Sequence, residues 1–166
     1  MTVTGWRMVA RGVAVVAVLA GTTACTVASQ QQPGQASAAV ADALSEASSA
    51  AQTTRITVEL LSEGRLTGPV ADTALLDQLR ALDDAEMALT TLVPPDATSS
   101  DQRATGLTAV GDVTDVVVHA REWGAARSGG GLDGASAVPA TAEELLADLA
   151  TATEGVDEAL AEAGGP

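Results

Sequence analysis

The sequence predicts an all-α protein, an antiparallel up-down-up-down four-helix bundle. Apolar residues recur at steps of three, four or seven along four segments, and Pro, Gly and capping residues separate those segments. The β-branched run Val116-Val117-Val118 has no second strand to pair with, so context favours helix there as well. A three-helix bundle with a loosely attached first or last helix is the main alternative.

The first helix is expected from about Gln35 to Glu63. One side of it carries the apolar residues Val40, Leu44, Ala47, Ala51, Val58 and Leu61. Only Thr54 interrupts this stripe. Gly64 can supply the left-handed residue that ends the helix, and Pro69 suits the first turn of the next one. Because the connection is short, the first two helices should be antiparallel neighbours.

The second helix is expected over residues 69–92. Its apolar face consists of Leu75, Leu79, Leu82, Leu89 and either Leu92 or Val93. Arg80 lies at helical spacing from Asp77 and Asp84 and can pair with either, as on a solvated face. The run Val93-Pro94-Pro95-Asp96 ends the helix, because proline lacks the amide donor and restricts the residue before it.

A capping-box pattern at Ser99–Gln102 predicts the start of a third helix, from about Ser100 to Ala126. Its buried face is expected to contain Leu107, Val110, Val113, Val117, Ala120 and, at the edge, Trp123. Arg127 follows Trp123 by one turn, so its guanidinium can lie over the indole.

The Gly-rich stretch that begins at Ser128 and continues to Pro139 predicts a flexible loop. A second capping box, Thr141–Glu144, then opens the fourth helix. This helix should bury Leu145, Leu149, Ala152, Val156 and Ala159. Gly155 in its middle indicates either a close helix crossing or a weak point, since Gly costs about 1 kcal/mol relative to Ala.

The first residues have the layout of an export signal. Arg7 and Arg11 precede the uncharged run Gly12–Ala24, which ends in small residues before Cys25. The apolar part is too short to cross a hydrocarbon core of ~30 Å as a helix. Residues 1–24 are therefore predicted to be a cleaved signal peptide.

The segment Leu19-Ala20-Gly21-Thr22-Thr23-Ala24-Cys25 resembles the lipobox of bacterial lipoproteins. The family usually has Leu three places before the cysteine, where this chain has Thr22. The resemblance implies cleavage before Cys25, a lipid on its thiol, and anchoring to the cell membrane on the extracytoplasmic face. A lone cysteine without a disulfide partner agrees with this role. The alternative is a plain secretory signal cut after Ala24, which would leave a secreted protein with a free thiol.

Behind Cys25, residues 25–34 are expected to form a polar, flexible tether and residues 35–166 the acidic, Ala-rich bundle. After residue 24 six basic residues face 22 acidic ones, for a formal charge of −16, which argues against nucleic acid as a partner. The chain lacks Lys, Asn, Phe and Tyr and has a single Ile, a bias typical of a GC-rich genome such as an actinobacterial one. Without Phe or Tyr, the core should consist of closely packed helices with small side chains.

Catalytic chemistry has little support in the sequence. His119 is the single histidine, no serine lies in a recognisable nucleophile turn, and the Gly-rich loop lacks the lysine of a phosphate loop. We therefore expect no catalytic residue and no cofactor beyond the lipid. The predicted function is a non-enzymatic, lipid-anchored envelope protein whose helical domain contacts another envelope protein or the cell wall.

One side-chain constellation supports an alternative function, a surface lipoprotein that binds a divalent cation. It consists of Asp112, Asp115, His119 and Glu122, at spacings that stack them along one side of the third helix. Carboxylates with one imidazole can ligate such a cation, and facing helices could add ligands. The same spacing also occurs on the solvent side of an acidic helix, and no Glu-x-x-His repeat is present.

Overall fold

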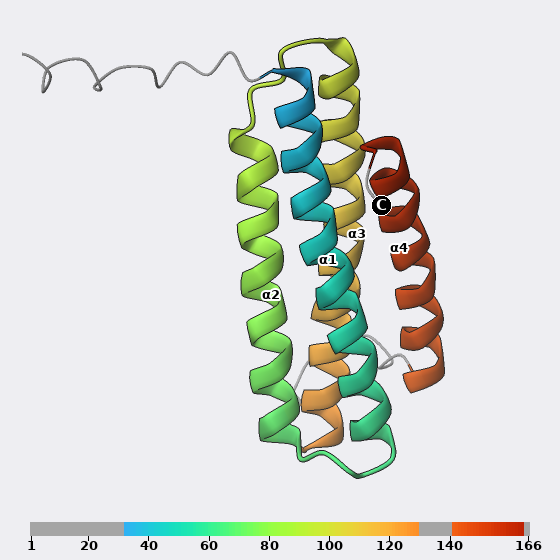
Figure 1. The fold of residues 1–166 in the computed structure, drawn as a ribbon. Coiled ribbons are helices and arrows are strands. Elements are labelled where there is room, and N and C mark those ends of the chain that lie inside the picture. The colour runs from blue at the N-terminus through green and yellow to red at the C-terminus, as the bar shows by residue number, and fades with distance from the viewer. Residues whose placement is uncertain (1–31, 130–140, 165–166) are drawn as a thin grey trace, which may run out of the picture. The chain divides into compact units, whose positions relative to one another are not determined.

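A computed structural model describes residues 32–129 and 141–164, and these ranges contain four α-helices and no strand (Figure 1). The helices are α1 (Pro33–Ser62), α2 (Gly68–Thr91), α3 (Ala97–Arg127) and α4 (Ala142–Glu162). The predicted all-α, four-helix fold is confirmed. The predicted signal peptide, the lipidation site Cys25 and most of the Gly-rich loop lie outside the described residues.

Helices α1 and α3 form the centre of the bundle. They contact each other, and each contacts both α2 and α4, whereas α2 and α4 make no contact within the described residues. The Oγ of Ser37 donates to Gln102 Oε1 at 2.8 Å near the starts of α1 and α3. At their ends, Arg127 donates to the carbonyl of Ser62 at 3.1 Å, so the two central helices run in the same direction.

The outer helices run the opposite way. Arg103, near the start of α3, donates to the carbonyl of Leu92 just after α2. Gln102 donates at 2.8 Å to the carbonyl of Glu162 in the last turn of α4. Consecutive helices therefore alternate in direction, as Figure 1 shows.

Two helix starts differ from the sequence prediction. Helix α1 begins at Pro33, so Pro33 and Gly34, which were expected in the tether, form its first turn, and Gln32 and Gln35 make a reciprocal capping box. Proline is favoured at this position because the first helical amides have no intrahelical acceptor. The tether predicted over residues 25–34 is therefore too long by these two residues.

Helix α3 begins at Ala97 rather than near Ser100. The carboxylate of Asp96 accepts the amide of Ser99 at 2.8 Å and caps the helix. The capping box predicted for Ser99–Gln102 is wrong, because Ser99 is buried inside the first turn and the Gln102 side chain bonds to other helices. The hydrogen bonds from Ser99 lower the pKa of the Asp96 carboxyl.

Two other predictions about helix ends are confirmed, one for the start of α4 and one for the end of α1. Thr141 and Glu144 form the predicted box, with Glu144 N–H donating to Thr141 Oγ1 at 3.1 Å and Thr141 N–H donating to the Glu144 carboxylate at 2.8 Å. Gly64 has φ +70°, and the amide of Arg65 donates to the carbonyl of Leu60 at 2.8 Å. This is the Schellman arrangement, which needs a residue that tolerates the left-handed region.

The core contains the predicted apolar faces of all four helices. Two leucine positions differ from expectation, because Leu79 and Leu107 are only partly buried. Of the two residues proposed for the end of the α2 face, Leu92 is in the core and Val93 is exposed. Gly106 is buried where α3 approaches its neighbours, and a β-carbon there would lie 3.4 Å from side chains of Leu89 and Val40. Small residues thus allow the close approach that the composition predicts.

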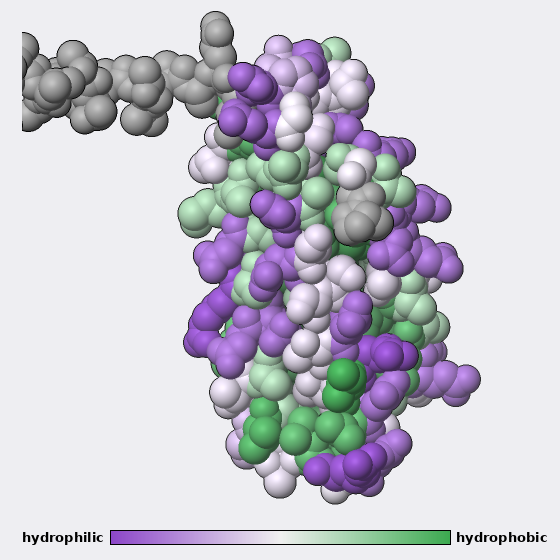
Figure 2. Space-filling model, viewed as in Figure 1, coloured by the Kyte–Doolittle hydropathy of each residue, from purple (hydrophilic) through white to green (hydrophobic). Residues whose placement is uncertain are grey.

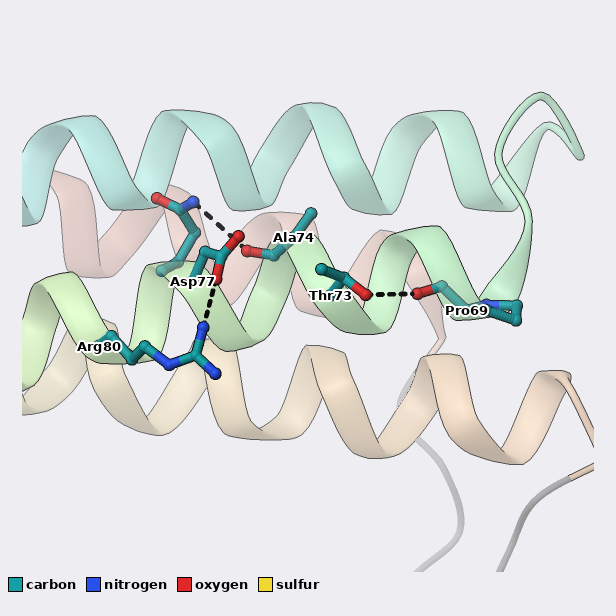
Figure 3. A network of polar contacts seen from close by, with 6 residues as sticks. Pro69, Thr73, Ala74, Asp77 and Arg80 are labelled. Carbon is teal, nitrogen blue, oxygen red and sulfur yellow. Dashed lines mark hydrogen bonds and ion pairs between the residues drawn. The ribbon is translucent and has the colours of Figure 1, made fainter.

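Polar contacts predicted from spacing are present on the surface. Arg127 lies over the ring of Trp123 at 5.5 Å from its centroid. Arg80 pairs with Asp77 rather than Asp84, on an exposed side of α2 where the hydroxyl of Thr73 also donates to the carbonyl of Pro69 (Figure 3). The exposed Arg80–Asp77 ion pair contributes little to stability, about 0.3–0.5 kcal/mol.

Candidate functional site

The four residues of the predicted cation site lie on one exposed side of α3. Asp112, Asp115, His119 and Glu122 all face solvent. Across residues 32–129 and 141–164, no group of three or more His, Cys, Asp or Glu side chains is placed to hold a metal ion. The spacing therefore aligns the four residues, as predicted, but no carboxylate from a facing helix joins them. The divalent-cation function stays a prediction.

Helix α4 carries the strongest uniform charge. Its seven carboxylates are all exposed, and the helix contains no basic residue: Glu143, Glu144, Asp148, Glu154, Asp157, Glu158 and Glu162. None of the ion pairs within the described residues includes one of them. The hydrogen bonds from Thr141 lower the pKa of the Glu144 carboxyl. This helix therefore presents a continuous anionic surface.

A cavity of about 250 Å³ lies between the start of α2 and the end of α3. It is lined mainly by apolar atoms, with Asp72 and Arg121 in its wall, and Arg121 Nε donates to Asp72 Oδ1 at 2.7 Å. Both side chains are roughly half exposed. A β-carbon at Gly68 would lie 2.0 Å from Ser128 Oγ, so a larger residue here would force the Ser128 side chain to move. The sequence did not predict this cavity. Of the residues that line it, only the adjacent Gly68 and Pro69 form a local sequence pattern.

Apolar side chains also gather on the surface where α1 ends and α2 begins, at the lower end of the face drawn in Figure 2. Ile56 and Val70 are 51% and 54% exposed, and Leu60 and Leu66 are partly exposed. The amide of Leu66 donates to the carbonyl of Leu60 at 3.2 Å, which fixes the turn between them. We call these four residues the distal patch, since they lie far from the start of α1.

The charges around the distal patch are paired. Arg65 lies 3.1 Å from Glu63, and Arg55 lies 3.9 Å from Glu59. This end of α1 is therefore locally neutral, although the chain as a whole has a formal charge of −14. A neutral apolar surface is the region where another macromolecule can approach an acidic protein with the least electrostatic cost.

No helix of the described residues is long and apolar enough to span a bilayer. No protein-family model matches the chain, and searches of curated proteins and of solved structures also found no match.

Proposed function

We propose that this protein is a non-enzymatic, lipid-anchored component of the cell envelope that presents its helical bundle to another envelope protein or to the cell wall. The single observation that carries the proposal is the segment Leu19–Cys25, which resembles a lipobox and precedes a helical domain by a few residues. A lipid on Cys25 would anchor the mature chain on the extracytoplasmic face of the membrane.

The short connection limits how far the bundle can stand from the bilayer. Seven residues separate Cys25 from Pro33, where α1 begins. A fully extended chain of this length spans roughly 25 Å. In an anchored protein the start of α1 would thus be near the membrane, and the distal patch would lie about 35–45 Å further along the helix axis, at 1.5 Å per residue.

This orientation supports the interaction part of the proposal. If the bundle stands upright on this tether, the distal patch would lie at its end farthest from the membrane, where envelope proteins or the cell wall could reach it. Exposed apolar clusters on a soluble domain often mark contact sites. The chain as a whole is strongly acidic, so an acidic neighbour would be repelled less at this locally neutral end than at the carboxylate-rich surface of α4.

Replacing Cys25 by Ala should abolish incorporation of a labelled fatty acid and release the protein from the membrane fraction. The reason is that the thiol is the only proposed attachment point for lipid. The measurement is metabolic labelling followed by fractionation of intact cells. A Thr22→Leu variant, which restores the usual aliphatic residue, is the matched control and should be labelled at least as well as the wild type. Wild-type protein found wholly in the medium without lipid would contradict the anchor.

A photo-crosslinking residue in place of Val70 should produce a discrete adduct on intact cells, because Val70 belongs to the distal patch. Met87 provides the matched control, since it is an exposed apolar residue of the same helix outside the patch, at 63% exposure. The measurement is the adduct pattern on a gel with identification of the partner. Equal adducts from both positions, or none from Val70, would oppose a role for the patch.

A further inference from the structure

We propose that α4 opens from α1 and α3 as a separate cooperative unit, and that dissolved cations close it by screening its carboxylates. The device is a switch sensitive to ionic strength. It rests on the packing and charge of α4 alone, and it does not depend on a lipid at Cys25 or on a partner at the distal patch.

Like charges oppose the folding of α4 along its own length. Three pairs of carboxylates lie four residues apart, namely Glu144 with Asp148, and Glu158 with both Glu154 and Glu162. Glu154 also lies three residues from Asp157. Such pairs destabilise a helix, and α4 contains no basic residue to offset them.

The helix dipole adds to this repulsion at one end. Glu143 and Glu144 lie in the first turn, where the positive end of the dipole favours carboxylates. Glu158 and Glu162 lie at the opposite end, where the last turn has no basic residue and the negative end of the helix dipole disfavours carboxylates. The C-terminal half of α4 is therefore the less stable half.

Helix α2 provides a comparison within the same bundle. Both α2 and α4 are outer helices, and each buries a similar set of five Leu, Val or Ala residues. In α2, however, Arg80 is at helical spacing from Asp77, Asp83 and Asp84 and is paired with the first. Helix α2 is also joined to α3 by Arg121 and Asp72. Helix α4 also packs less extensively against α1 and α3 than α2 does, so weaker packing and uncompensated charge both favour the opening of α4 rather than α2.

The elements packed against α4 supply little positive charge. On α1, Arg55 is near Glu59, and on α3, Arg127 lies over Trp123. Helix α3 adds four exposed carboxylates, at positions 101, 112, 115 and 122. Among the described residues, the one side-chain hydrogen bond from another helix to α4 is that from Gln102 to the Glu162 carbonyl. Opening would uncover the sides of α1 and α3 that α4 covers.

The test is hydrogen exchange measured by mass spectrometry on the full-length chain in a non-ionic detergent at constant pH. Salt is varied from about 20 mM to about 500 mM, because the screening length then falls from more than 20 Å to less than 5 Å. Protection factors of α4 should be lower than those of α2 at low salt. They should rise several-fold with salt, while those of α2 change less.

The decisive variant is Glu158→Arg, which turns two like-charge pairs into attractive ones and places a cation at the C-terminal end of the dipole. It should raise the protection of α4 at low salt roughly tenfold and leave α2 unchanged. Glu143→Arg is the control for net charge, which it changes equally. Because Glu143 belongs to none of the like-charge pairs and Arg is unfavourable at the positive end of the helix dipole, this variant should not raise protection. If α4 and α2 exchange with equal protection, or if α4 does not respond to salt, the proposal is wrong. Equal protection by both arginine variants would also overturn it, because net charge alone would then explain the effect.

Discussion

The Leu82→Ala variant should unfold with a free energy about 3 kcal/mol lower than the wild type. Leu82 is fully buried near the middle of α2, and truncation removes apolar contacts and leaves a cavity that a closely packed core fills only in part. Domains of this size have total stabilities of roughly 5–15 kcal/mol, so the loss is a large fraction. Urea denaturation followed by circular dichroism at 222 nm measures it.

Leu79→Ala is the matched control for this prediction. It removes the same atoms from the same helix, but Leu79 is only partly buried. Its effect should be less than half of that of Leu82→Ala, because part of the side chain already contacts water in the folded state. Equal losses for the two variants would mean that α2 packs with a different rotation from the one described.

The difference between these two leucines shows what periodicity can predict. Both lie on the apolar stripe of α2, and spacing alone assigned them to the same face. The structure separates them because α2 contacts α1 and α3 but not α4 within the described residues, so only a narrow sector of α2 is covered. The width of that sector depends on how many helices surround α2, which is a tertiary property.

Local competition explains the incorrect start of α3. Asp96 and Ser99 are both favourable N-cap residues, and each is followed by a helix-compatible sequence. The sequence pattern favoured Ser99 because Gln102 completes a capping box. In the fold, Gln102 instead joins α1 to α4, and this tertiary use leaves Asp96 as the cap. By contrast, the side chains of Thr141 and Glu144 make no other hydrogen bond in the part of the chain that the structure describes, and their predicted box forms.

Of the candidate sites, the sequence could predict only the one whose residues all lie on a single helix. Asp112, Asp115, His119 and Glu122 share one side of α3 because of their spacing, and the structure places them there. The cavity beside Asp72 and Arg121 requires two residues 49 positions apart to meet, and no local pattern indicates that contact. The distal patch likewise joins α1 to α2 across a turn, so its continuity depends on the pairing of the helices.

The Thr54→Val variant should be more stable than the wild type by about 1–2 kcal/mol. Thr54 was the one polar interruption of the α1 stripe, and it lies in the core with no exposed surface. Its hydroxyl has no hydrogen-bond partner, so folding removes it from water without compensation. Valine has nearly the same shape and avoids that cost. The measurement is the shift of the urea midpoint at an unchanged denaturant slope.

Thr57→Val distinguishes this explanation from a general preference for valine in the core. Thr57 lies on the same helix and is only 5% exposed, but its hydroxyl donates to the carbonyl of Thr53 at 2.8 Å. Replacing Thr57 by Val removes this hydrogen bond, so the free energy of unfolding of the variant should stay unchanged or fall. If Thr54→Val and Thr57→Val raised the free energy of unfolding equally, burial of the added methyl group would explain both gains. If Thr54→Val lost stability, the hydroxyl of Thr54 would bond in solution to the carbonyl one turn earlier, as threonine does elsewhere in α1.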